Sequence, residues 1–240
     1  MITAIHSCSR FCTQAEWADL AGTTVNEVLV EFRTYDPRVI RDSSLALAEH
    51  LGYPTNSSLP LVDAGLRVRS RDDVAHRMLC LDALVAAACG FPRKKALAWL
   101  ERQHAASYLA ESEIAFFRGQ GDAVVVKHRV ESLWALAWCV CLVPELDFSL
   151  PCSDNLVTLV PDIESEEAAV AFTQALRLRN EDAIIAKCDL AYCLHWAIQN
   201  SLTNRQRAPG KLHPIYVIER RRALEWLLSD SDWDHVLMDT

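Results

Sequence analysis

This sequence has few glycines, fewer basic than acidic residues and only short apolar runs. Its 240 residues include only 7 glycines, which disfavours a β-sandwich or barrel because such folds depend on many tight turns. The longest apolar run, at residues 133–143, is about half as long as a membrane-spanning helix. Lysine and arginine number 24 against 32 acidic residues, for a formal net charge of −8, whereas a nucleic-acid-binding protein usually shows a basic excess. We therefore expect neither a membrane nor a nucleic acid as a direct partner.

Common catalytic and ligand-binding motifs are also missing. The sequence has no glycine-rich phosphate loop, His-Glu-x-x-His, Gly-x-Ser-x-Gly or Cys-x-x-Cys. His6, Cys8 and Cys12 could offer zinc ligands, but no second ligand pair follows at a usable spacing. Asp234 and Asp239 do not match a known metal-binding pattern either. We therefore predict no cofactor and no metal, and an enzyme is the less favoured class.

What is present fits a globular protein of a reducing compartment. Hydrophobic residues make up 51% of the chain and charged residues 23%, enough to bury a real core. The N-terminus lacks a basic region followed by an apolar run, so we expect no signal peptide and a cytoplasmic location. The cysteines number nine, and several lie within apolar helical patterns, where a free thiol behaves as a small hydrophobic group: Cys80, Cys89, Cys139, Cys141, Cys188 and Cys193.

Apolar residues recur at helical spacing along most of the chain. The pattern predicts an all-α fold, a single multi-helix globular bundle over residues 38–240. Residues 1–37 are predicted to form an N-terminal extension that could include one short strand. Residues 1–12 are expected to form an extended segment. Helices are expected at 13–22, 24–32, 37–52, 70–88, 107–118, 122–143, 165–179, 180–203 and 214–228. A further helix is expected to begin at Pro92.

Capping residues mark several of these helix starts. Asp36 precedes a proline at the first helical position, where the missing N–H costs nothing. The side chains of Ser70, Ser165 and Asn180 are expected to accept a hydrogen bond from a backbone N–H in the first turn of a helix. The helix at 122–143 is apolar on all sides over three turns, which places it at the centre of the bundle.

Several residue runs occur in a characteristic order along the chain: Arg41, Gly52 and Leu59-Pro60 upstream, then Leu133 to Trp138 with Glu145 and Asp147, His195-Trp196, Glu219-Arg220 with Trp226, and Trp233 to Thr240. Together they resemble a known bacterial family, the "domain of unknown function 4272", over roughly residues 38–240. The resemblance implies an all-α fold and brings no established reaction. Some families of this kind lie beside secreted bacterial toxins as immunity proteins.

Three polar residues of the last two helices could meet inside the bundle. His195 lies on an apolar stripe, and Glu219 and Arg220 flank the apolar face of the final helix. One interpretation is a general acid–base pair with an arginine that holds an anion. The favoured interpretation is a structural polar network, because buried charges must be paired.

An acidic stretch is the strongest feature of the charge distribution. No lysine or arginine occurs between Val130 and Leu176, and the acids there sum to −8, which equals the net charge of the whole chain. One interpretation is solubility and stabilisation of a helix start. The other is a surface that attracts a basic partner, formed by six residues: Glu145, Asp147, Asp154, Asp162, Glu164 and Glu166.

Together these features favour a non-enzymatic interaction protein. We expect an immunity protein that neutralises a cognate bacterial toxin by covering its basic active site, as on a nuclease. Such toxins include those delivered by secretion systems such as type VI. The alternative is an enzyme of undefined class with a pocket at His195, Glu219 and Arg220, and a helical scaffold is a third possibility.

Overall fold

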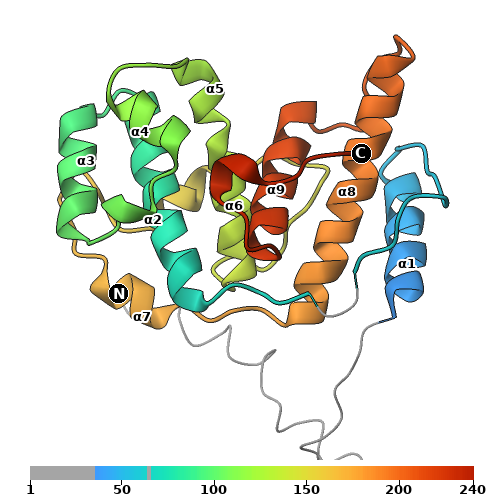
Figure 1. Ribbon diagram of the computed structural model, residues 1–240, viewed down its shortest axis with the longest axis horizontal. Coiled ribbons are helices and arrows are strands. Elements are labelled where there is room, and N and C mark those ends of the chain that lie inside the picture. Colours follow the sequence, from blue (N-terminus) through green and yellow to red (C-terminus); the bar gives the residue numbers. More distant parts are fainter. Residues whose placement is uncertain (1–35, 64–65) are drawn as a thin grey trace, which may run out of the picture. The chain divides into compact units, whose positions relative to one another are not determined.

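The computed structural model describes residues 36–63 and 66–240, and every regular element in those ranges is a helix (Figure 1). The predicted all-α class is therefore confirmed for this part of the chain. The expected strand at 1–12 and helices at 13–22 and 24–32 lie outside the described residues. The elements are α1 (Pro37–His50), α2 (Arg71–Ala88), α3 (Arg93–Arg102), η3 (Ala106–Tyr108), α4 (Glu111–Phe117), α5 (Ala123–Lys127), α6 (Arg129–Cys139), η4 (Asp154–Thr158), α7 (Val170–Ala175), α8 (Glu181–Thr203), α9 (Pro214–Leu227) and η5 (Trp233–His235).

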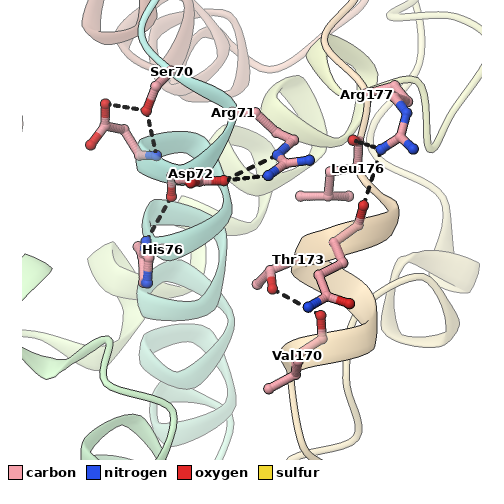
Figure 2. Close-up of polar contacts among 10 residues, drawn as sticks. Ser70, Arg71, Asp72, His76, Val170, Thr173, Leu176 and Arg177 are labelled. Carbon is pink, nitrogen blue, oxygen red and sulfur yellow. Dashed lines mark hydrogen bonds and ion pairs between the residues drawn. The ribbon is translucent and has the colours of Figure 1, made fainter.

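Three of the predicted caps hold the starts of α1, α2 and α8. Asp36 accepts a hydrogen bond from the Arg38 N–H, and Asn180 accepts one from the Ala183 N–H. Ser70 accepts from the Asp73 N–H at the start of α2, which Figure 2 shows opposite the end of α7. Each cap satisfies a backbone N–H that has no partner within its helix.

Helix α6 lies at the centre of this part of the chain, as predicted. It packs against α9 and α2, α8 packs against α9, and α1 covers the other side of α8 (Figure 1). Helix α2 has buried residues on two faces. Val74 and Met78 belong to the main core, while Leu79 and Leu84 belong to a second core with Trp99 of α3.

The prediction of one continuous helix over 122–143 is wrong, because the helix is interrupted and ends earlier than expected. It divides at His128 into α5 and α6, and Val124 and Val125 of α5 are exposed. At the break, the His128 N–H binds the Val125 carbonyl three residues earlier, a tighter turn than the four-residue spacing of an α-helix. Helix α6 ends at Cys139 because Cys141 adopts a left-handed φ of 61° and the Leu142 N–H returns to the Ala137 carbonyl.

Two further helix predictions are corrected. The helix expected at 165–179 is reduced to α7, and Ser165 caps nothing, since its hydroxyl donates to the Asp162 carbonyl. The helix expected at 107–118 divides into η3 and α4. In α1, Leu47 is exposed and Arg41 is buried, because Arg41 pairs with Asp189 of α8. Within the described ranges, no helix combines the length and apolarity required to cross a bilayer.

Candidate interaction surface

The predicted trio of His195, Glu219 and Arg220 does not share one pocket. Arg220 pairs with Glu131 of α6, with its Nε and Nη2 atoms 2.7 and 2.6 Å from the Glu131 carboxylate, and both side chains are almost fully buried. The other guanidinium hydrogen bonds go to the carbonyls of Asp147 and Leu150. Arg220 is therefore fully occupied within the protein.

The two other members of the trio have separate partners. Glu219 accepts hydrogen bonds from Arg129 (3.1 Å) and from the Ser132 hydroxyl (2.8 Å). The Nδ1 atom of His195 lies 2.6 Å from an Nη1 of Arg221, the residue after Arg220. Each predicted residue thus ties α8 or α9 to a neighbouring segment, an arrangement that favours the structural interpretation over a catalytic one.

His195 is uncharged at neutral pH in this environment. Burial lowers its pKa to about 4, and the positive charges of Arg221 and Arg222 act in the same direction. Because arginine can only donate, Nδ1 accepts this hydrogen bond. The histidine thus serves as an acceptor that helps to hold Arg221 in place.

We expect the stability contributed by His195 to fall as the pH is lowered. The unfolded state binds a proton near pH 6.5 and the folded state only near pH 4, so acid favours unfolding between these values. From pH 7.5 to pH 4.5 the loss should be about 2–3 kcal/mol relative to a His195→Gln variant. Urea unfolding of both proteins at the two pH values measures it. Parallel losses in both proteins would contradict the assignment.

The acidic stretch forms a long connection over the bundle, which we call the acidic loop (residues 144–169). It contains seven acidic residues and no lysine or arginine. Its backbone is bound to the bundle near both ends. Lys187 of α8 donates to the Leu146 carbonyl (3.3 Å), Arg220 of α9 binds two further carbonyls, and Trp99 of α3 donates to the Glu167 carbonyl (3.0 Å). The loop therefore extends from α8 and α9 to α3.

These contacts leave the carboxylates of the acidic loop available to solvent. The neighbouring cations bind its carbonyl oxygens, so they do not form salt bridges with its carboxylates. Among the described residues one surface pair forms, between Glu166 and Arg102 at 3.1 Å, and such exposed pairs contribute little. Of the six predicted residues, Asp147 is half-buried and the others are exposed: Glu145, Asp154, Asp162, Glu164 and Glu166.

Two of these acids also shape the loop itself. Asp162 accepts hydrogen bonds from the backbone of Glu164 and Ser165, and its hydrogen bonds with Ser165 and Glu164 lower its pKa, so it remains ionised. Asp147 accepts from the Ser149 N–H at 2.7 Å. Asp162 and Asp147 therefore combine a structural role with their charge.

Sequence reasoning missed one acidic residue that adjoins this surface. Asp82 of α2 is half-buried, and burial raises its pKa to about 7, with the nearby charge of Asp162 adding to the effect. Its Oδ2 atom has no hydrogen-bond partner among the described residues. The residue lies inside an apolar helical pattern, between Leu81 and Ala83, so no local signal connected it with the distant acidic loop.

Comparison with known proteins adds a family but no activity. No curated protein and no solved structure shows significant similarity to the chain. One family model matches, described as a domain of unknown function (DUF4272), and the match covers residues 41–236. This range includes nearly all of the described helices and the whole acidic loop, so the chain belongs to the DUF4272 family.

Proposed function

We propose that this protein is a non-enzymatic binding protein whose acidic loop captures a partner with a basic surface. The specific role we propose is that of an immunity protein, which neutralises a cognate bacterial toxin in the cytoplasm. One observation carries the proposal: seven carboxylates without a single basic residue lie on a loop whose backbone is firmly bound to the bundle. A charged surface that is held in place keeps its geometry when a partner arrives.

Charge on this surface acts mainly on the rate of association. Clustered charges of one sign attract an oppositely charged partner over several ångströms and orient it before contact. A nuclease toxin offers such a partner, because its active site must bind the phosphate backbone of its substrate. An acidic protein seated over that site would exclude the substrate sterically.

Apolar side chains in the acidic loop could hold the partner after the encounter. Leu150 and Val157 are 60% and 72% exposed, although both are large hydrophobic residues. Interfaces commonly place apolar contacts beside a polar rim. The proposal therefore assigns steering to the carboxylates and retention to these side chains.

The test uses the purified protein and the product of the adjacent reading frame in the source genome. We expect the triple variant Glu145→Gln, Asp154→Asn, Glu164→Gln to associate about five- to tenfold more slowly at low ionic strength. All three side chains are exposed and make no hydrogen bond within the described residues, so folding should be unaffected. Stopped-flow fluorescence gives the association rate.

A matched control removes the same charge elsewhere. Asp42 and Glu49 of α1 and Glu101 of α3 are also exposed, and neutralising all three should change the rate less than about twofold. If both triple variants slow association equally, net charge alone is responsible. If neither does, the acidic loop is not the binding surface.

A further inference from the structure

Two segments that lead into long helices share one sequence pattern, although they lie far apart in the chain. Residues 66–70 read Leu-Arg-Val-Arg-Ser, and residues 176–180 read Leu-Arg-Leu-Arg-Asn. We call these segments strap 1 and strap 2. The apolar residues of both straps belong to the main core or pack against it. The last residue of each strap caps the helix that follows, α2 or α8, by accepting from the backbone N–H three residues later. The straps therefore match in sequence and in local structure.

Helices α6 and α9 share a second pattern. Residues 131–138 read Glu-Ser-Leu-Trp-Ala-Leu-Ala-Trp, and residues 219–226 read Glu-Arg-Arg-Arg-Ala-Leu-Glu-Trp. The shared glutamate, alanine, leucine and final tryptophan are buried in both helices. Helix α2 packs against α6 as α8 packs against α9, and α6 and α9 pack against each other (Figure 1). The bundle thus contains two similar helix pairs.

Each strap binds the tryptophan-containing helix of the other pair through its second arginine. In strap 1, the Arg69 Nε and Nη2 atoms each lie 2.7 Å from a carbonyl oxygen, of Trp226 and Ser231. In strap 2, the same atoms of Arg179 lie 2.9 and 3.0 Å from the carbonyl oxygens of Trp138 and Val143. In both cases the second acceptor lies five positions after the tryptophan. The last carbonyls of a helix lack partners within it, and a cation is favoured there.

The backbone and ring contacts of the two arginines match as well. The Arg69 N–H donates to the Leu227 carbonyl at 2.9 Å, and the Arg179 N–H donates to the Cys139 carbonyl at 2.8 Å. Each acceptor is the residue after the tryptophan. The guanidinium carbon of Arg69 lies 4.6 Å from the ring centre of its tryptophan, and that of Arg179 lies 4.5 Å from its own. A chance likeness of two short sequences would not reproduce the same contacts with the same acceptor positions.

The shared glutamates are paired in the same crossed way. Glu131 of α6 binds Arg220 of α9, and Glu219 of α9 accepts a hydrogen bond from the Ser132 hydroxyl of α6. Each glutamate thus binds the residue that follows the other glutamate. The two partners differ in charge, and at Glu219 the cation is supplied by Arg129 instead.

We infer that the domain is built from two copies of one unit, a strap with a helix pair, and that the straps are exchanged between the copies. Exchange of an identical element is a common way to join two copies of a fold. Arg69 and Arg179 are then equivalent clamps, and each fixes the segment that follows one tryptophan. Arg179 holds Val143, directly before the acidic loop, and Arg69 holds Ser231 of the C-terminal segment (residues 229–240). The inference does not rest on the proposed function, because it concerns only how the protein itself is held together.

Hydrogen–deuterium exchange of the full chain and of matched variants tests the inference. Arg179→Met should speed exchange by about tenfold within residues 140–150 and leave residues 228–236 unchanged, and Arg69→Met should do the reverse. Both variants should lower the midpoint of thermal unfolding by a similar amount, because each loses the same set of contacts. Arg67→Met, at an exposed arginine of strap 1, should change neither segment.

Lysine variants keep the test decisive if a methionine variant does not fold. Arg69→Lys and Arg179→Lys retain the charge but lose the planar fork that binds two carbonyls. Each should therefore give a smaller effect in the same segment as its methionine counterpart. The inference is overturned if both clamp variants loosen the same segment, if only one of the two arginines matters, or if Arg67→Met acts like Arg69→Met.

Discussion

Replacing Arg220 with methionine should lower the free energy of unfolding by about 3–5 kcal/mol, because it leaves the Glu131 carboxylate buried without its cationic partner. Arg220 is completely buried and Glu131 is 1% exposed. The same substitution removes the donors that hold the carbonyls of Asp147 and Leu150. The acidic loop should therefore loosen as well. Urea denaturation at pH 7 measures the loss.

Two control variants isolate the cause. The double variant Arg220→Met, Glu131→Leu should regain part of the stability, since no unpaired charge remains. Arg207→Met removes an exposed arginine that makes no hydrogen bond or salt bridge among the described residues and should cost less than about 0.5 kcal/mol. A loss below about 1 kcal/mol for Arg220→Met would mean that the buried pair does not stabilise the fold.

Gly210→Ala should destabilise the protein by about 2–5 kcal/mol for two reasons that add. Gly210 has a φ of +77°, which is strained for any residue with a side chain. A Cβ atom there would also lie 2.2 Å from the Tyr53 ring. Tyr53 follows α1 and is 3% exposed, so the ring cannot move into solvent without opening the core.

A second glycine separates strain from collision. Gly121 has a similar φ of +83° but nothing within 4 Å of the added Cβ. Gly121→Ala should therefore cost only about 1–2 kcal/mol, the strain alone. The double variant Tyr53→Leu, Gly210→Ala should be less unstable than the sum of its single changes, because the smaller side chain makes room. Equal losses for the two glycine variants by thermal unfolding would rule out the collision.

Local signals predicted the parts of the fold that depend on neighbouring residues. Asp36, Ser70 and Asn180 cap helices by binding N–H groups two or three residues away, so the sequence contains all that the cap requires. Ser165 is the same kind of capping residue, but it does not cap a helix. The nearby Glu167 carbonyl accepts a hydrogen bond from Trp99, 68 residues earlier, and no local pattern reveals that contact.

The same limit applies to the polar residues. The sequence predicted that Glu219 and Arg220 would be buried, and both are. It could not assign their partners, because successive residues of a helix point about 100° apart. Glu219, Arg220 and Arg221 therefore reach three different places, and the partner of His195 is Arg221 rather than Arg220. The pairing of Arg220 with Glu131 spans 89 residues.

The acidic loop could be predicted better than these pairs. A stretch without lysine or arginine is visible in the sequence, and one interpretation of its acids was a surface that attracts a basic partner. What the sequence could not supply was the way the loop is held. Lys187, Arg220 and Trp99 bind its carbonyls, and this leaves the carboxylates available.

The most direct test of the proposed function is hydrogen–deuterium exchange of the protein alone and in complex with the product of the adjacent reading frame. If the acidic loop is the binding surface, amides within residues 144–169 should exchange more slowly in the complex, while those of α1 keep their rates. Unchanged exchange across residues 144–169, with protection on α1 or α3 instead, would contradict the proposal.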